Sequence, residues 1–87
     1  MTEKQKIVIL IDYPSKNGWC HLVANSIKDL HSFAKSIGVN KRYFHNNPKN
    51  NKPHYDIRGK KIQKAIEFGA KQVNSKDIVT FLKKIYK

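Results

Sequence analysis

Cysteine and long apolar stretches are scarce in this chain. The single thiol, Cys20, excludes an intramolecular disulfide and any zinc site built from several cysteines. The continuous apolar run at residues 7–11 is much shorter than the roughly 20 residues that cross a membrane. It is also too short for the core of a signal peptide. We therefore expect a cytoplasmic protein without a membrane partner.

Acidic residues are also few. Asp and Glu number 6 against 18 Lys and Arg, which gives a formal net charge of +12 and a sequence pI near 10.0. Such a charge attracts phosphate and leaves nonspecific nucleic-acid association open. The lysines are scattered along the chain, however, and Lys, Asn and Ile all have A/T-rich codons. Codon bias therefore explains the charge equally well.

The length of 87 residues indicates one domain, residues 1–87, with one small core. Hydrophobic residues make up 39% and charged residues 28%, a composition typical of a folded protein rather than a disordered one. Because so small a core gives limited stability, we expect that the chain can associate into a homo-oligomer.

The first half of the chain predicts strands and a helix in alternation. Residues 7–11 are continuously apolar and β-branched, as in a central strand covered on both faces. Residues 19–24 form either a short strand or an extended lead-in to a helix. That helix begins after Asn25 or Ser26 and ends at Gly38. Residues 39–45 then predict a further strand.

The second half begins with residues 46–53, which are rich in Asn and Pro and predict a flexible loop. Asp56 then caps a helix, and residues 70–73 form a short strand. Asn74 or Ser75 starts the last helix. The alternation predicts a small single-domain α/β fold in two or three layers. We expect a mostly parallel sheet of three to four short strands with about three helices.

Two places along the chain gather polar side chains that suit a functional site. Asp12 follows the first strand, and ligands of open α/β sheets collect beyond the carboxyl ends of the strands. The structural alternative for Asp12 is a cap on the following turn. The run His54-Tyr55-Asp56 lies between the loop and the predicted helix start. Its structural alternative is a histidine bonded to the backbone, a tyrosine packed on the sheet and a helix-capping carboxylate.

Several motifs occur in an order that resembles a known family. They are Trp19-Cys20-His21-Leu22-Val23-Ala24, Leu30-His31-Ser32-Phe33-Ala34, Arg42 with Phe44, His54-Tyr55-Asp56 and Gly69-Ala70. Through them, residues 7 to about 79 resemble the bacterial and phage family called domain of unknown function 4031.

The resemblance implies a shared polar site without implying a particular activity. Two positions depart from the family, which usually has Ser where Cys20 stands and Asp where Asn25 stands. If that Asp takes part in chemistry, the role is lost here, although Asn caps a helix equally well. Occurrence in phages implies, by association, a sequestering or host-manipulating protein. The motif positions that the resemblance implies for the site are His21, His31, Arg42, His54, Tyr55 and Asp56.

The polar side chains favour binding of a phosphate-bearing, nucleotide-type ligand at the carboxyl edge of the sheet. Arg42 and Arg58 are the two arginines, and their planar guanidinium groups can each hold phosphate oxygens in pairs. Histidines can donate hydrogen bonds, and Trp19, Tyr43 or Tyr55 can stack on a base. The predicted ligand-binding residues are Asp12, His21, His31, Arg42, His54, Tyr55, Asp56 and Arg58.

A metal-dependent phosphoesterase or nuclease is the alternative function. It would use Asp12, His54 and Asp56, ligand types that bind Mn, Fe or Zn and can thereby activate water. His21 offers a further ligand of the same kind. The spacing matches no recognised metal signature, so the sequence assigns no cofactor. Cys20 beside His21 also suggests a thiol nucleophile, although a buried, inert cysteine is the commoner outcome.

Overall fold

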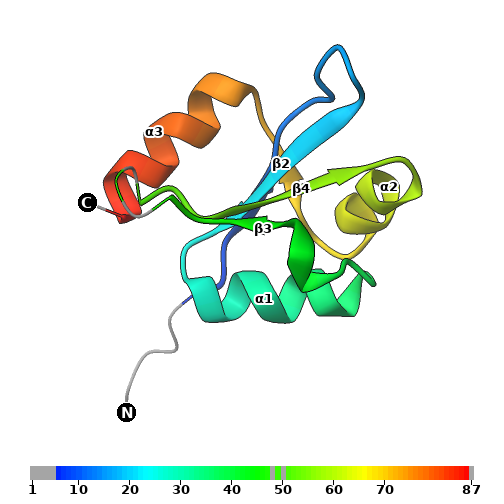
Figure 1. Ribbon diagram of the computed structural model, residues 1–87, viewed down its shortest axis with the longest axis horizontal. Coiled ribbons are helices and arrows are strands. Elements are labelled where there is room, and N and C mark those ends of the chain that lie inside the picture. Colours follow the sequence, from blue (N-terminus) through cyan, green and yellow to red (C-terminus); the bar gives the residue numbers. More distant parts are fainter. Residues whose placement is uncertain (1–5, 48, 50, 87) are drawn as a thin grey trace.

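The computed structural model describes residues 6–47, 49 and 51–86, which build a sheet with helices on both faces (Figure 1). No helix among these residues has the length and hydropathy of a membrane span. In chain order the elements are β1 (Ile9–Ile11), β2 (Trp19–Ala24), α1 (Ile27–Ser36), the 3₁₀ turn η1 (Lys41–Tyr43), β3 (Phe44–His45), β4 (His54–Arg58), α2 (Lys60–Glu67), β5 (Lys71–Gln72) and α3 (Ser75–Ile85).

The sheet has five strands in the order β3-β4-β2-β1-β5, and it is mixed. Among the described strands, only β1 and β5 pair in parallel; the other three pairs are antiparallel. The predicted mostly parallel sheet of three to four strands is therefore wrong in direction and in strand number. The cause is the short connection at residues 12–18. A parallel crossover needs about a dozen residues or more, so this connection returns the chain as a hairpin.

Residues 54–58 form strand β4 rather than the start of a helix. Asp56 lies opposite His21 in the antiparallel ladder between β4 and β2. The prediction that Asp56 caps a helix is therefore wrong. The following helix, α2, begins after Gly59, whose φ of +66° turns the chain out of the strand without any side-chain cap.

The three predicted helices are confirmed. For two of them, the capping residues in the sequence predicted the first residue of the helix to within one position. Ser26 caps α1 by accepting a hydrogen bond from the backbone N–H of Asp29. Gly38 follows the end of that helix at φ +77°, a conformation that favours glycine. Asn74 caps α3 by accepting from the backbone N–H of Asp77. Local polar contacts of this kind do not depend on the rest of the fold.

The segment before β4 differs in detail from the prediction. The strand predicted at residues 39–45 is shortened to β3. The residues just before β3 form the 3₁₀ turn η1 instead, which Asn40 caps. In the predicted loop 46–53, residues 48 and 50 lie outside the described residues, and the others belong to no helix or strand. The segment joins β3 to β4, which pair antiparallel as a hairpin.

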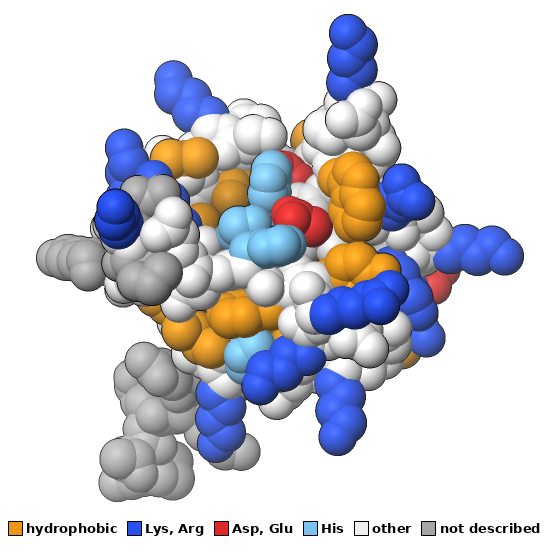
Figure 2. Space-filling model, in the orientation of Figure 1, with side chains coloured by type: hydrophobic (Ala, Val, Ile, Leu, Met, Phe, Trp, Pro, Cys, Tyr) orange, Lys and Arg blue, Asp and Glu red, His pale blue; other side chains and the backbone are white. Residues whose placement is uncertain are grey.

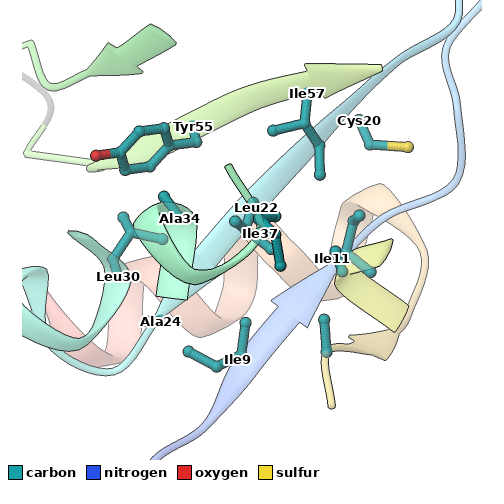
Figure 3. Close-up of a cluster of buried hydrophobic side chains, with 12 residues drawn as sticks. Ile9, Ile11, Cys20, Leu22, Ala24, Leu30, Ala34, Ile37, Tyr55 and Ile57 are labelled. Atoms are coloured by element: carbon teal, nitrogen blue, oxygen red, sulfur yellow. The ribbon is translucent and has the colours of Figure 1, made fainter. Parts of the chain in front are cut away.

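Helices α1 and α2 cover one face of the sheet and α3 covers part of the other (Figure 1). Figure 3 shows buried side chains of β1, β2 and β4 in one cluster with Leu30 and Ala34 of α1. Under α3, a smaller cluster contains Val23, Ile78 and Leu82. α3 contacts Leu10 of β1 and Val23 near the end of β2, whereas the outer surface of β3, β4 and the start of β2 carries exposed or half-buried side chains and is called the open face. The main core consists of Ile9, Ile11, Cys20, Leu22, Ala24, Leu30, Ala34, Ile37, Tyr55, Ile57, Ala65 and Ala70.

Candidate histidine–carboxylate site

The open face of the sheet collects histidines and carboxylates from β2, β3 and β4. Side chains alternate between the two faces of a strand, so the buried Cys20 leaves its neighbour His21 on the open face. Antiparallel pairing sets His21 opposite Asp56, and His45 opposite His54. Figure 2 shows histidine side chains gathered around acidic side chains at the centre of this face. The site thus lies on a sheet face, not at the carboxyl edge of parallel strands as predicted.

The buried carboxylate of Asp12 forms hydrogen bonds with both the backbone and the ring of His21. Its side chain is only 2% exposed, and it accepts hydrogen bonds from the backbone N–H of His21 at 2.7 Å, from His21 Nδ1 at 2.7 Å and from Ser75 Oγ at 3.1 Å. These three donors compensate the carboxylate for its loss of water. Because Nδ1 of His21 donates to Asp12, Nε2 is the ring nitrogen left to bind a ligand.

His54 and Asp56 bring two hydrogen-bond acceptors together. Nδ1 of His54 lies 2.9 Å from the backbone carbonyl oxygen of Lys52, and because a carbonyl only accepts, Nδ1 carries the proton. Nε2 of the neutral ring is then an acceptor, yet it lies 3.4 Å from Oδ1 of Asp56. Nε2 of His45 lies 3.0 Å from the other oxygen, Oδ2. A second proton or a cation between the two atoms would make the His54–Asp56 contact favourable.

The spacing of these atoms suits a metal ion. Two ligands at about 2.0–2.1 Å from a tetrahedral ion are roughly 3.3 Å apart, close to the 3.4 Å between His54 Nε2 and Asp56 Oδ1. One ligand atom from each of His21, His54 and Asp56 lies within 4.8 Å of the others. To bind one tetrahedral ion together, the three side chains would have to move closer to one another, because 4.8 Å exceeds the ligand spacing of such an ion. Two imidazoles and a carboxylate suit Zn, Mn or Fe, with a fourth position open to water or substrate.

A groove lined by cationic and aromatic side chains adjoins this site. Its larger part has a volume of about 610 Å³, and Arg42, Arg58 and Lys61 are among the residues that line it. An adjacent part of about 500 Å³ reaches the histidines. Trp19 and Tyr43 line both parts, so they lie between the arginines and the histidine–carboxylate site. The size of the groove is that of a typical small-molecule or cofactor site.

Five of the eight predicted ligand-binding residues lie on the open face or along this groove, and a sixth, Asp12, hydrogen-bonds to one of them. Asp12 is buried and binds the His21 ring, and its predicted ligand-binding role stays a prediction. The six are Asp12, His21, Arg42, His54, Asp56 and Arg58.

The other two predicted residues, His31 and Tyr55, lie on the opposite side of the sheet. Tyr55 is 2% exposed and belongs to the main core beneath α1. Burial raises the pKa of its hydroxyl, which therefore keeps its proton and can donate it to His31 Nδ1, 2.6 Å away. The ring of Phe44 packs against His31 with 4.5 Å between ring centroids. This pair stabilises the contact between α1 and the sheet and does not join the site.

Three further residues near the site, His45, Ser75 and Lys61, are not among the predicted ligand-binding residues. His45 reaches Asp56 only because β3 and β4 form a hairpin. Ser75 bonds to Asp12 from the start of α3, 63 positions away in sequence. Lys61 enters the groove from α2. The contact of His45 could have been predicted by assuming a hairpin with its turn in residues 46–53. In such a hairpin the alternation of side chains places His45 on the same face as His54 and Asp56.

Cys20 is not part of the open face. Its side chain is fully buried, and burial first and the charge of Asp12 second raise the pKa of the thiol from 9.0 to about 11. At pH 8 only about one thiol in a thousand is then ionised. We expect iodoacetamide to leave the native protein unmodified at pH 8 and to alkylate it after denaturation, as measured by mass spectrometry. Rapid alkylation of the native protein would restore the nucleophile hypothesis.

Fold and site together define a small three-layer α/β domain that presents a histidine–carboxylate centre on the open face of a mixed sheet. The family model described as "Protein of unknown function (DUF4031)" matches residues 9–85, and the chain belongs to this family. The family resemblance of the sequence is thereby confirmed. No curated protein and no solved structure matches the chain.

Proposed function

We propose that the protein is a metal-dependent phosphoesterase whose metal ion is held by His21, His54 and Asp56. The observation that supports this most directly is the approach of two acceptors, His54 Nε2 and Asp56 Oδ1, to 3.4 Å. A divalent cation between them would satisfy both atoms and lie within reach of His21. The arginines of the adjoining groove are suited to bind the phosphate of a substrate.

The remaining polar groups orient these three ligands. Asp12 and the backbone carbonyl of Lys52 each bind Nδ1 of a histidine, which leaves Nε2 without a proton and directed to the site. Outer partners of metal-bound histidines commonly act in this way. A divalent ion held there would lower the pKa of a bound water toward about 7 and so supply hydroxide near neutral pH.

The substrate side of the proposal uses the cationic groove. Arg42 and Arg58 would hold the non-bridging oxygens of a phosphodiester and spread its developing negative charge. His45 is 53% exposed and lies beside Asp56, where it can donate a proton to the leaving oxygen. Relative to the sequence hypothesis, His21 replaces Asp12 as a ligand because Asp12 is already saturated by its three donors.

Metal-free binding of a phosphate-bearing nucleotide is the second candidate. In that case a second proton lies between His54 and Asp56, and the contact is an ion pair. The larger part of the groove favours this function, since its lining has three cationic side chains and the single carboxylate of Asp56. The phage-type sequestering role and the homo-oligomer that the sequence suggests remain predictions.

Titration of the metal-stripped protein with Zn²⁺ and Mn²⁺ separates the two candidates. We expect isothermal titration calorimetry to give one ion bound per chain, and we expect hydrolysis of bis(p-nitrophenyl) phosphate to appear with the ion and to stop in EDTA. A protein that binds neither ion, yet binds a nucleotide in EDTA, is the result that favours the second candidate and rejects the first.

A further inference from the structure

We infer that the groove beside the histidine–carboxylate site binds single-stranded nucleic acid, with successive bases stacked on Trp19 and Tyr43. The inference rests on the proposed function, because it names the substrate class of the same site. Proteins that bind single strands combine a positively charged groove with aromatic side chains on which bases stack. Both features meet in this groove.

The two aromatic rings are arranged as neighbouring platforms rather than as a clamp. Their centroids are 6.2 Å apart and their planes are inclined by 41°. A base sandwiched between two rings would need parallel planes roughly 7 Å apart, which is twice the stacking distance of about 3.5 Å. Trp19 and Tyr43 therefore cannot enclose one base between them. Their arrangement suits one base on each ring, and thus a chain of at least two nucleotides.

Each ring already has a cation lying over it. The guanidinium carbon of Arg58 is 4.8 Å from the centroid of the Trp19 ring, and that of Arg42 is 5.1 Å from the centroid of the Tyr43 ring. Arg42 also donates to the Tyr43 hydroxyl at 3.1 Å, a bond that lowers the pKa of Tyr43. A base that takes the place of a guanidinium group on a ring frees that group for the neighbouring phosphate. Each ring and its arginine thus match one nucleotide.

The groove leads such a strand to the histidine–carboxylate site. Trp19 and Asp56 line both its larger and its smaller part, and His21 and His45 line the smaller part. A strand stacked on the rings would therefore place a phosphate beside the proposed metal ligands. Stacking requires unpaired bases whose faces are exposed, which a duplex does not offer. The net charge of the whole chain, +12, adds a general attraction for the phosphate backbone.

The single tryptophan makes the test direct, because intrinsic tryptophan fluorescence reports on Trp19 alone. In EDTA, a short oligothymidylate is expected to quench this fluorescence and to bind about tenfold or more tighter than thymidine monophosphate or a duplex of equal length. If three phosphates meet the three groove cations, the logarithm of the affinity should fall with the logarithm of the salt concentration with a slope of about −2.

Variants test the stacking itself. With a dye-labelled oligothymidylate and fluorescence anisotropy, Trp19→Ala is expected to weaken binding about 5- to 150-fold, the range for loss of one base–aromatic stack. Trp19→Phe keeps a ring and should stay close to the unmodified protein. Tyr43→Ala should weaken binding similarly, which covers the case that Trp19→Ala fails to fold. Tyr13→Ala is the matched control, since Tyr13 is 58% exposed and lines neither part of the groove.

Failure of this inference and failure of the proposed function give different results. Equal affinity for thymidine monophosphate and the oligonucleotide, or full binding by both Trp19→Ala and Tyr43→Ala, overturns the inference while the metal titration still stands. Tight single-strand binding in EDTA by a protein that binds no metal overturns the phosphoesterase. That outcome supports the nucleic-acid groove as a binding site.

Discussion

Replacing His54 by alanine is expected to weaken Zn²⁺ binding by more than about 100-fold and to abolish hydrolysis of bis(p-nitrophenyl) phosphate. Loss of an outer partner of a metal ligand already costs about 10–100-fold in affinity, and loss of the ligand should cost more. Of the three proposed ligands, the variant keeps His21 and Asp56. Calorimetric titration of the metal-stripped protein measures the affinity. Unchanged Zn²⁺ affinity would reject the proposed centre and make the His54–Asp56 contact a simple ion pair.

His31→Ala is the matched control, because His31 is a histidine on the other side of the sheet. It should bind Zn²⁺ like the unmodified protein, since it lies outside the histidine–carboxylate site. Its stability should fall by about 1–3 kcal/mol, because the buried hydroxyl of Tyr55 loses its partner at 2.6 Å. His54→Ala should show the reverse pattern, with a small stability change, which urea unfolding measures. The crossed result separates a ligand from a structural histidine.

The sequence predicted the local structure of this protein better than its topology. Ser26 and Asn74 predict helix starts because a capping side chain bonds to a backbone group only three positions away. Both caps are present. The direction of the strands depends on which strands meet. Alternating strands and helices suggested crossovers, but the turn at residues 12–18 and the hairpin that follows β3 return the chain antiparallel. No local signal separates a strand at residues 54–58 from an extended helix lead-in.

The candidate site also depends on contacts between residues far apart in the sequence. The sequence named His21, His54 and Asp56 individually, and pairing of β2 with β4 is what brings them together. Tyr55 was grouped with them because it is their neighbour in sequence. Adjacent residues of a strand point to opposite faces, however, so Tyr55 lies on the face opposite His54 and Asp56. Ser75 could not be found at all, since its contact with Asp12 depends on where α3 packs.

Asp12→Asn is expected to lower Zn²⁺ affinity by about 10–100-fold while the protein stays folded. An amide has one acceptor oxygen in place of two, so its NH₂ group must face one of the donors that now bind the carboxylate. If it faces the His21 ring, Nδ1 becomes the acceptor and the ring proton moves to Nε2, the nitrogen that the metal needs. The buried mismatch should also cost about 1–3 kcal/mol of unfolding free energy. Calorimetry and urea unfolding measure the two effects, and nitrogen NMR of the imidazole shows which ring atom carries the proton.

A double-mutant cycle decides whether Asp12 acts through His21. In a His21→Ala background, Asp12→Asn should change the Zn²⁺ affinity little further, because the ring that Asp12 orients is gone. Asp77→Asn removes an exposed carboxylate in the first turn of α3 and serves as the control for loss of one negative charge. Equal losses from Asp12→Asn and Asp77→Asn would mean that only net charge matters. Additive losses in the cycle would mean that Asp12 contributes independently of His21, contrary to its position beneath that ring.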